Sequence, residues 1–579
     1  MNTRLFKLIL SAIVFLIAAY NPIITNAQVL SSADSSRFFR PLEFNNEIIV
    51  NKNIANPNLY KPYANVLFTN INITQNSSPQ NEPSVRISRK NPNRVVAAWR
   101  DFRYGIDPIA NRRIGYSYSL DSGLTWSVPM ILDSTLLPGD PKNSDPVVGV
   151  DSAGNFYIGV ITLNSASSNG VLAVYKSTDG GVTFPFAYVA ASSSGTGEDK
   201  EYITIDLVPG SPYKNTIYFT WTRFVSGQRI ICVKSTNGGV NWSTPVAVSE
   251  ATSGVQGSDP AISTNGQINV VWLANNGSVS SIYYDKSNDG GNTFGTDIVI
   301  SSGTTPSGLP NNAPTFPSIA ADISGGPRNG YLYVVFSDSR NGDPDVFLCR
   351  STNSGNNWST PVRVNNDAVA NGKLQYWPWI GVNDNGNIAI IWMDTRNTAN
   401  NTIIEAFLAR SNDGGLTFTN ELLSSQPSPT SVPGTNVRFG DYICIDYWKN
   451  KIVPVWTDER AGGYDMEIYT AVINTVVGVE PIANNIPAEF KLYQNYPNPF
   501  NPNTIIRFQI KDSRFVTLKV YDILGKEVAT LVNENLNAGT YEVPFSISSI
   551  TNNQKASGVY FYRLETGNFT DVKRMILIK

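Results

Sequence analysis

The stretch Ser119-Leu120-Asp121-Ser122-Gly123-Leu124-Thr125-Trp126 recurs along the chain as Ser-x-Asp/Asn-x-Gly-x-Thr/Asn-aromatic. Five further copies follow it, and neighbouring copies start 52 to 64 residues apart. The first residues of these copies are Ser177, Ser235, Ser287, Ser351 and Ser411. Six copies at a nearly constant spacing form an internal repeat, so a modular array is the first architecture to consider.

Each copy has the composition of a tight turn at the end of a hairpin. Asp or Asn next to Gly tolerates left-handed backbone angles, and its side chain accepts hydrogen bonds from backbone N–H groups. The aromatic residue that follows can pack beneath the turn. The repeat resembles the Asp-box, also called the BNR repeat, of the sialidase-like β-propellers. In that family the box is remote from the active site, so the resemblance implies architecture rather than chemistry.

The segments between the copies predict strands. Most units open with a polar or acidic residue, often before Pro, and continue into an apolar strand. The seven opening segments are 81–85, 144–148, 199–203, 258–262, 316–319, 377–380 and 440–443. Helix-like periodicity is nearly absent, so the class is all-β.

Seven opening segments accompany only six repeat turns, because the seventh unit ends at 468–473 without one. A lone strand at 66–74 can complete this unit and close the ring, which would hide the sheet edges. The sequence therefore predicts a seven-bladed β-propeller over 65–474. A six-bladed propeller, as in the sialidases, is the alternative.

The N-terminal segment predicts export. Residues 1–27 combine the basic Arg4 and Lys7, an apolar run and the small-residue site Thr25-Asn26-Ala27, which is typical of a signal peptide. The apolar run is too short to span a membrane comfortably, so no transmembrane segment is expected in the mature chain. Residues 28–64 read as an irregular arm and 475–487 as a linker.

Residues 488–579 differ in character from the repeats and predict a second domain. Four ordered motifs, 496–502 (Tyr-Pro-Asn-Pro-Phe-Asn-Pro), 520–525, 557–560 and the basic-apolar end 573–579, resemble the type A C-terminal sorting domain of the bacterial type IX secretion system. The resemblance implies a small Ig-like β-sandwich, open to cleavage, with the type IX machinery as partner. The protein is then secreted or held on the outer-membrane surface of a bacterium. A generic accessory β-sandwich is the alternative.

Composition excludes several kinds of chemistry. The chain contains no histidine, which removes Ser-His-Asp and Cys-His catalysis and histidine metal sites. With 44 Lys+Arg against 46 Asp+Glu, nothing indicates a nucleic-acid partner. Cys232, Cys349 and Cys444 lie in apolar runs and are predicted to be buried rather than disulfide-bonded.

No cofactor is predicted. The oxygen-rich stretch 341–345 could hold calcium, but a plain turn is favoured because the full loop pattern is missing.

A second motif, aromatic-x-Asp-x-Arg, ends four of the second strands, at 99–103, 336–340, 392–396 and 456–460. One interpretation is a ring of Arg103, Arg340, Arg396 and Arg460, joined by Arg438, around one mouth of the propeller. Such arginines could bind a carboxylate, sulfate or phosphate in bidentate fashion. The alternative is bracing between blades, which recurrence in four units favours.

Features that occur once are better candidates for catalysis. Asp199 and Glu201 flank Lys200, which could bias their pKa values, and Asp441 and Tyr442 open the seventh unit. These four residues are the predicted catalytic groups. Trp377 and Trp379 offer faces for stacking on sugars. The alternative for each is a strand-end salt bridge or aromatic packing between blades.

The resemblance to sialidases implies three arginines on the sugar carboxylate, an Asp as acid/base, and a Tyr nucleophile assisted by a Glu. The Phe/Tyr-Arg-Ile-Pro motif of that family is absent, and 111–115 is a poor substitute, so no residue role is transferred. The first hypothesis is an exo-sialidase-like glycoside hydrolase acting on extracellular glycans. The alternatives are non-catalytic binding of a glycan, glycoprotein or other protein, and a polysaccharide lyase with Tyr or Lys as base.

Overall fold

The structure is a computed structural model. It describes residues 68–105, 112–138, 142–164, 167–192, 197–224, 227–250, 254–310, 314–430, 439–474, 481–483, 487–501, 503–546 and 557–578. The predicted signal peptide, the N-terminal arm, Arg438 and most of the predicted linker lie outside these residues. The chain divides into two compact units, Met1–Ile473 and Asn474–Lys579, here called unit 1 and unit 2.

Within the described residues, unit 1 consists of seven antiparallel sheets, each built mainly from consecutive strands. Sheet 1 contains β2 (Gln80–Ile87), β3 (Val95–Asp101), β4 (Arg113–Ser119) and β5 (Met130–Ile131). Sheet 2 contains β6 (Lys142–Val150), β7 (Phe156–Asn164), β8 (Ser167–Ser177) and β9 (Phe186–Ser192). Sheet 3 contains β10 (Glu198–Ile205), β11 (Ile217–Arg223), β12 (Arg229–Ser235) and β13 (Val246–Ala247). Sheet 4 contains β14 (Val255–Ile262), β15 (Ile268–Asn276), β16 (Val279–Ser287) and β17 (Ile298–Thr304).

Sheet 5 contains β18 (Ser318–Ala321), β19 (Leu332–Asp338), β20 (Asp345–Ser351) and β21 (Val362–Arg363). Sheet 6 contains β22 (Gln375–Val382), β23 (Ile388–Asp394), β24 (Ile403–Ser411) and β25 (Thr419–Leu422), with β26 (Ser428–Pro429) paired to β24. Sheet 7 contains β27 (Cys444–Trp448), β28 (Lys451–Asp458) and β29 (Glu467–Ala471), with β30 (Ile473–Asn474) paired to β28. Two 3-10 turns, η2 (Ser134–Leu136) and η3 (Thr264–Gly266), interrupt the strand pattern.

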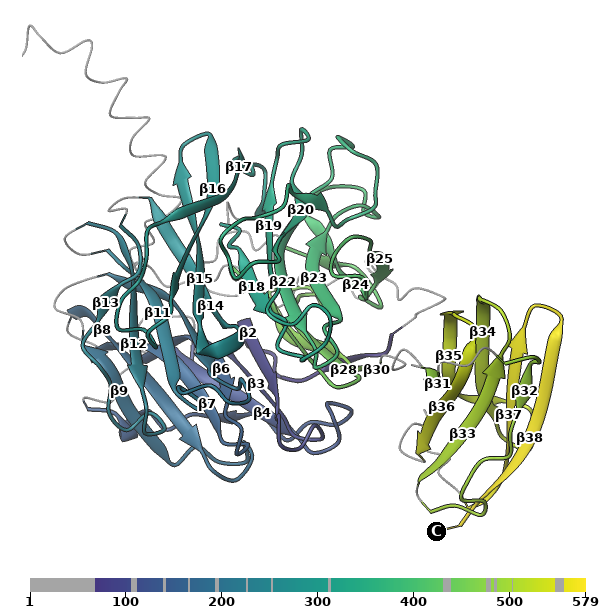
Figure 1. The fold of residues 1–579 in the computed structure, drawn as a ribbon. Coiled ribbons are helices and arrows are strands. Elements are labelled where there is room, and N and C mark those ends of the chain that lie inside the picture. Colours follow the sequence, from purple (N-terminus) through teal and green to yellow (C-terminus); the bar gives the residue numbers. More distant parts are fainter. Residues whose placement is uncertain are drawn as a thin grey trace, which may run out of the picture. The chain divides into compact units, whose positions relative to one another are not determined.

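The seven sheets form a closed ring around their first strands. In chain order, β2, β6, β10, β14, β18, β22 and β27 each contact the next, and β27 contacts β2. In Figure 1 the labels β2, β14, β18 and β22 lie toward the middle of unit 1, and β9, β13 and β25 lie at its margin. The fourth strand of sheet 7 is β1 (Asn70–Asn72), from the N-terminal side, which pairs antiparallel with β29. The predicted closure by an N-terminal strand is therefore confirmed.

The repeat turns lie at one end of the ring. In sheet 1, Ser119 pairs with Val95, so the turn that follows β4 lies where β3 begins. The Asp121 carboxylate accepts hydrogen bonds from Thr125 N at 2.8 Å and Thr125 Oγ1 at 2.7 Å. The Trp126 ring nitrogen donates to Gly123 O at 2.9 Å, so the aromatic residue folds back on the turn. We call this end the repeat-turn end.

Cations on the third strands join neighbouring sheets at the repeat-turn end. Lys234 Nζ of sheet 3 donates to Gly290 O in the turn of sheet 4 at 2.6 Å. Lys286 Nζ of sheet 4 donates to Ser354 O in the turn of sheet 5 at 2.8 Å. Arg350 of sheet 5 donates to Gly414 O in the turn of sheet 6 at 3.1 Å. In sheets 4, 5 and 6 the repeat turn therefore also accepts a hydrogen bond that holds the sheet against the one before it.

Unit 2 contains two antiparallel four-stranded sheets among its described residues. One has the order β31 (Pro481–Ala483), β36 (Gly539–Ser546), β33 (Asn503–Ile510) and β32 (Lys491–Leu492). The other has the order β35 (Glu527–Leu536), β34 (Arg514–Tyr521), β37 (Gly558–Thr566) and β38 (Phe569–Leu577). Side chains from both sheets form one hydrophobic core, which includes Phe508, Leu518 and Tyr562.

Candidate functional site

The first strands of unit 1 share a backbone irregularity near their start. A register shift occurs in sheets 1, 2, 3, 4 and 6, where two residues of the first strand lie opposite one residue of the second strand. The first of these two residues has a positive φ: Glu82 at 54°, Asp145 at 53°, Lys200 at 58°, Gly257 at 70° and Trp377 at 54°. Such bulges re-aim side chains and are common beside functional sites.

Strand pairing identifies the equivalent position in the other two sheets. In these five sheets the residue two places after the positive-φ residue pairs with the second-strand residue that precedes Trp99 in sheet 1, Val160 in sheet 2, Trp221 in sheet 3, Trp272 in sheet 4 and Trp392 in sheet 6. Phe336 and Trp456 occupy this second-strand position in sheets 5 and 7. By the same register, Phe316 and Tyr442 are equivalent in sheets 5 and 7. We call the seven equivalent residues hub positions: Glu82, Asp145, Lys200, Gly257, Phe316, Trp377 and Tyr442. Charged residues occupy three consecutive hub positions, and aromatic residues occupy three others.

The hub positions meet at the axis of the ring. Lys200 Nζ lies 3.2 Å from the centroid of the Tyr442 ring and 5.1 Å from that of Phe316, although sheet 3 adjoins neither sheet 7 nor sheet 5. A side chain at Gly257 would collide with the Phe316 ring, which explains the glycine there. Because these hub positions touch across the ring, we call Glu82, Asp145, Lys200 and Tyr442, together with the adjacent Arg100, Glu201, Tyr202 and Asp441, the hub cluster.

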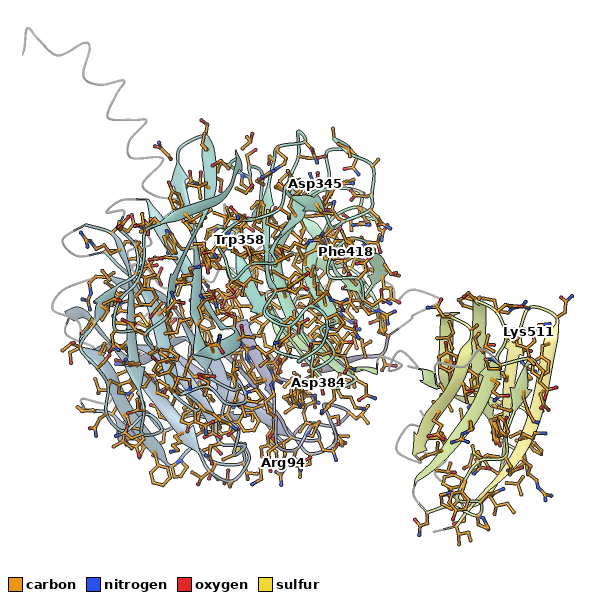
Figure 2. The ribbon with its side chains drawn as sticks, viewed as in Figure 1. Arg94, Asp345, Trp358, Asp384, Phe418 and Lys511 are labelled. Atoms are coloured by element: carbon orange, nitrogen blue, oxygen red, sulfur yellow. The ribbon has the colours of Figure 1, made fainter. Side chains whose placement is uncertain are left out.

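The hub cluster lies at the end of the ring opposite the repeat turns. In sheet 1 the start of β2 pairs with the end of β3, whereas the repeat turn lies where β3 begins. Figure 2 shows Asp345, where β20 begins at the hub-cluster end, well apart from Arg94 and Asp384 on turns at the repeat-turn end. Every second-to-third strand connection of the seven sheets is therefore on the hub-cluster side.

Two carboxyl groups and one arginine form the charged side of the cluster. Arg100 NH2 lies 3.0 Å from Glu82 Oε1, and Arg100 NH1 lies 3.6 Å from Asp145 Oδ1. Arg100 Nε also donates to Asn81 Oδ1 at 2.8 Å, which fixes the guanidinium. The Glu82 side chain is 1% exposed and that of Asp145 is 15% exposed. One carboxyl group is thus fully buried and the other is slightly exposed, and both lie beside one cation.

The pKa values of the two carboxyl groups are shifted in opposite directions. Burial raises the pKa of Glu82 to about 8 against the charge of Arg100, and the charges of Asp145 and Asp441 add to the rise. Burial also acts to raise the pKa of Asp145, but the charges of Arg100 and Lys200 and hydrogen bonds with Ser144 and Glu82 bring it below its ordinary value. At neutral pH the pair therefore holds one proton on Glu82 and one negative charge on Asp145. Such a separation assigns acid and base roles.

The hub cluster also holds buried polar atoms without hydrogen-bond partners among the described residues. They are Lys200 Nζ, both Glu201 carboxyl oxygens, Tyr202 OH, Tyr442 OH and Glu82 Oε2. Lys200 is 2% exposed, Glu201 1% and Tyr442 4%. Leaving a buried donor or acceptor unsatisfied costs about 1–3 kcal/mol, and more for a charged group. A concentration of such atoms at one place is a feature of functional sites.

Three of the four residues predicted as catalytic belong to this cluster. Burial, followed by the charge of Asp145, raises the pKa of Glu201 well above its ordinary value. Burial likewise raises the pKa of Tyr442, with added repulsion from Glu82 and Asp145. Asp441 lies close enough to Glu82 and Arg100 for its charge to act on both. Asp199 instead accepts a hydrogen bond from Gln256 Nε2 at 2.7 Å, just before the bulge.

The arginines of the predicted ring are engaged by side chains of the protein itself. Arg103, Arg340, Arg396 and Arg460 each form an ion pair with the Asp of their own motif. Three of them also reach the preceding sheet: Arg340 donates to Ser301 Oγ at 2.7 Å, Arg396 to Asn366 Oδ1 at 2.6 Å and Arg460 to Ser425 Oγ at 2.8 Å. These contacts are those of the bracing interpretation. A role of these arginines in substrate binding stays a prediction.

The two predicted stacking residues are packed inside the ring. Trp377 is 2% exposed, donates its ring nitrogen to Pro314 O at 2.8 Å and stacks on Phe439 at 6.4 Å. Trp379 is 4% exposed and lies 4.9 Å from the Tyr202 ring. Their contacts are aromatic packing between sheets, the alternative given above, and a stacking role stays a prediction.

The stretch 341–345 forms a hydrogen-bonded turn. The Asp345 carboxylate accepts Arg363 Nε and Asn365 Nδ2, each at 2.7 Å, and Asn341 Nδ2 at 2.7 Å. Its oxygens are therefore engaged by donors that compete with a cation. No group of three or more His, Cys, Asp or Glu side chains suited to a metal ion occurs within the described ranges. Calcium binding at this turn is not tested by these contacts and stays a prediction. All three cysteines are buried and free of disulfides, as predicted.

Sequence reasoning missed Glu82, Arg100 and Asp145 as site residues. Glu82 and Asp145 stand in Asn81-Glu82-Pro83 and Ser144-Asp145-Pro146, which were interpreted only as strand openings. One signal was available in the sequence. Glu82 and Asp145 occupy the same position in their units as Lys200 does in the third, and equivalent positions of a closed ring face one axis. Arg100 gave no such signal, since it occupies an ordinary strand position before the recurring Asp.

The comparison with protein families identifies part of the chain. Residues 494–579 match the model described as the secretion system C-terminal sorting domain. This tail indicates handling by the type IX secretion system and export to the cell surface or the medium. No helix in the described ranges is both long enough and apolar enough to cross a membrane. No curated protein matches the sequence.

Solved structures with similar folds belong to several kinds of protein. A protein of unknown function from Dyadobacter fermentans is 14% identical, with a TM-score of 0.41, over 71% of this chain and 99% of its own. The Hadza microbial sialidase Hz136 is 14% identical, with a TM-score of 0.39, over 70% of this chain and 68% of its own. An α-L-arabinanase from Penicillium chrysogenum is 14% identical, with a TM-score of 0.38, over 70% of this chain and 98% of its own. Likenesses of this size do not assign an activity.

Proposed function

We propose that this exported protein cleaves extracellular glycans by acid–base chemistry at the hub cluster, as a glycoside hydrolase of the exo-sialidase-like kind. The observation that carries the proposal is the pair Glu82 and Asp145, held by one arginine with their pKa values shifted apart. Paired carboxyl groups with separate acid and base roles are the usual catalytic device of glycosidases. We also propose that unit 1 is a seven-bladed β-propeller whose repeat turns are Asp-boxes, and that unit 2 is Ig-like.

The roles follow from protonation and exposure. Glu82, protonated at neutral pH, donates its proton to the leaving oxygen of the scissile bond. The ionised and more exposed Asp145 accepts the hydroxyl proton of Tyr442, the proposed nucleophile, as its oxygen bonds to the anomeric carbon and the scissile bond breaks. Water then attacks the anomeric carbon and gives its proton to the Glu82 carboxylate, while Asp145 returns its proton to the departing Tyr442 oxygen. Asp441 and Arg100 adjust the charge around the pair, since both act electrostatically on Glu82. No step requires a histidine or a metal ion.

Burial of the cluster favours a second candidate, non-catalytic glycan binding. Glu82, Lys200 and Tyr442 are at most 4% exposed, so a substrate can reach the cluster only past its more exposed members. Those members are Asp145, at 15% exposure, and Arg100, at 9%. A binding protein needs only this outer part of the cluster, whereas an enzyme must also use Glu82.

The test uses the full exported chain with a panel of glycans. The panel contains a fluorogenic sialoside, neutral polysaccharides and uronate-containing polysaccharides, and the products are measured as free fluorophore, new reducing ends and unsaturated uronates. Glu82→Gln and Asp145→Asn should each lower turnover about 10²–10⁴-fold, the usual contribution of a general acid or base. Unsaturated products would instead indicate the lyase alternative.

A matched control separates chemistry from folding. Glu421→Gln removes a carboxylate that pairs with Arg410 on outer strands of sheet 6, at 2.7 Å. This variant should keep wild-type turnover, and all variants should retain the wild-type circular dichroism spectrum. Wild-type turnover in both hub variants would overturn the acid–base assignment. Retention on a glycan column without turnover of any glycan would favour the binding protein.

A further inference from the structure

The four sequence motifs of the sorting domain meet at one end of unit 2, although up to 80 residues separate them. Gly558 of β37 pairs with Leu577 of β38, which brings the third motif to the chain end. Tyr521 of β34 pairs with Phe561, so the turn after β34 lies at the same end. Phe500 of the first motif bridges to Leu577. Figure 1 marks the C-terminus at this end of the unit.

The first motif forms the edge of the last strand. Phe500 N donates to Ile576 O at 2.9 Å, and Ile578 N donates to Phe500 O at 3.0 Å. Asn498 Oδ1 accepts Ile576 N at 2.8 Å, and Gln494 Nε2 donates to Arg574 O at 2.7 Å. Because these bonds use the outer backbone groups of β38, the motif covers that edge. Phe500 packs into the core of the unit, whereas Tyr496 is exposed.

Large apolar side chains are exposed at this end. Leu524 is 86% exposed, Tyr496 81%, Ile523 70%, Ile578 50% and Ile505 45%. Tyr496 pairs with Ile505, and Ile523 and Leu524 form the turn after β34. Elsewhere in the described part of unit 2, only Phe515 and Val572 are comparably exposed hydrophobic residues. Clustered exposed apolar residues mark interaction sites, whereas single ones are ordinary.

Cations flank the exposed apolar residues. Lys526 follows the turn directly, and Arg574 lies on β38 four residues before Ile578; both side chains are exposed. Neither has an ion-pair partner among the described residues, whereas at the other end of the unit Arg514 pairs with Asp512. The one carboxylate of the turn, Asp522, accepts the backbone nitrogens of Leu524 at 2.9 Å and Lys526 at 3.0 Å. The end therefore combines an apolar centre with a basic rim.

We propose that this end, defined by Tyr496, Ile523, Leu524, Lys526, Arg574 and Ile578 and called the export face, is the surface by which the secretion machinery binds the chain. Its complement is a protein receptor with an apolar recess bordered by carboxylates. Apolar residues at the centre supply most of the affinity in such interfaces, and rim charges supply orientation and association rate. Three of the motifs, 496–502, 520–525 and 573–579, contribute residues to this face, and the third motif supports it because Gly558 pairs with Leu577. The face therefore exists only in the folded unit.

The test measures export of the full chain in its own host, as the ratio of protein in the medium and on the surface to protein retained in the periplasm. Leu524→Asp should lower this ratio about tenfold or more, because the lost apolar contact weakens binding to the receptor. A tenfold loss of affinity corresponds to about 1.4 kcal/mol of binding free energy. The double reversal Lys526→Glu with Arg574→Glu should lower it as well. The matched control is Phe515→Asp, which places the same charge at another exposed apolar residue, 51% exposed and near the opposite end, and it should be exported normally.

The outcomes are distinct. Because Leu524 and Lys526 lie on an exposed turn, the retained variants should resist protease and melt at the wild-type temperature. Normal export of both Leu524→Asp and the charge-reversal variant would overturn the proposal. Equal loss of export in Phe515→Asp would also overturn it, since any added charge would then suffice. The proposal does not depend on the hub cluster, whose variants should be exported normally.

Discussion

Lys200 Nζ lies 3.2 Å from the centroid of the Tyr442 ring, across the axis of a ring in which their sheets are not neighbours. A desolvated cation–π contact contributes about 2 kcal/mol or more. Burying an ammonium group costs several kcal/mol, and this one finds no hydrogen-bond acceptor among the described residues. The hub thus holds a cation at a cost in stability, which is typical of a site selected for chemistry.

Replacing Lys200 by Met should therefore stabilise the fold while removing function. The thioether side chain has a similar volume and keeps the contact with Tyr442 and Phe316, so the free energy of unfolding should rise by about 1–4 kcal/mol. Turnover of any glycan that the wild type cleaves should fall at least tenfold, because the charge balance around Glu82 changes. Chemical denaturation and the glycan assay measure the two effects. A clear loss of stability would mean that the ammonium group braces the hub.

Stability should fall as the pH rises from about 5 to about 9. Burial raises the pKa of Glu459 to about 8, and that of Glu467 to about 7 against a hydrogen bond from Thr74. It also raises the pKa of Glu82 to about 8. A folded pKa above the unfolded value means that the folded state binds more protons between the two, so the stability present at low pH is lost as the pH rises through the folded pKa.

Denaturant midpoints at pH 6 and pH 9 test this dependence. The midpoint should be higher at pH 6, and Glu459→Gln should reduce the difference, since a neutral amide there does not ionise. Glu489→Gln, at an exposed carboxyl group of unit 2, is the control and should leave the difference unchanged. A midpoint that rises with pH would contradict the assignment of raised pKa values.

Cutting a link between sheets at the repeat-turn end should destabilise unit 1. Lys234→Met removes hydrogen bonds from the ammonium to Gly290 O at 2.6 Å and Asn292 Oδ1 at 2.7 Å. Bonds made by a charged group contribute about 1.5–3 kcal/mol, and partial exposure should bring the loss to the lower part of that range. Lys214→Met, at an exposed lysine, serves as control in the same thermal melts. Equal melting temperatures for the two variants would show that the link contributes nothing.

The closing strand should depend on Asn70. Its side chain accepts Ser425 N at 2.6 Å and Arg460 NH2 at 3.0 Å, and donates to Leu423 O at 2.9 Å. Asn70→Ala should cost about 2–4 kcal/mol, because three partners between sheets 6 and 7 lose their bonds together. Hydrogen exchange should increase at β1 and β29 before it increases elsewhere.

Asn76→Ala is the control for this variant. Among the described residues, the Asn76 side chain bonds only to the nearby Ser78 N, at 2.9 Å, so its loss should be small. If Asn70→Ala and Asn76→Ala had the same melting temperature, closure of the ring by β1 would not limit stability.

The sequence predicted the fold well because its signals are local. Asp121 and Gly123 specify a turn within a few residues, and six copies of that turn set the number and spacing of the sheets. The unpaired seventh unit and the spare strand before Asn81 together predicted the closure that Asn70 and Ala471 make. The motifs of the sorting tail likewise predicted the match of residues 494–579.

The candidate site was predicted in part. Glu201, Asp441 and Tyr442 were found because they break the pattern of their units, and they do lie in the hub cluster. Glu82 and Asp145 were passed over because each sits in a repeated Pro-containing opening that looked like scaffold. Arg103 and its equivalents were singled out by recurrence. All four pair with the Asp of their own motif, and Arg340, Arg396 and Arg460 also contact the preceding sheet.

By itself, then, the sequence determined the all-β class, the repeated sheet, the need for a closing strand and the exported tail, since each of these rests on residues near one another in the chain. Only the tertiary structure decided which carboxyl group keeps its proton. That choice depends on burial and on charges from different sheets: Glu82 acquires its raised pKa beside Asp145 and Arg100 only when the ring closes. The same holds for the export face, whose segments become one surface through strand pairing across 80 residues.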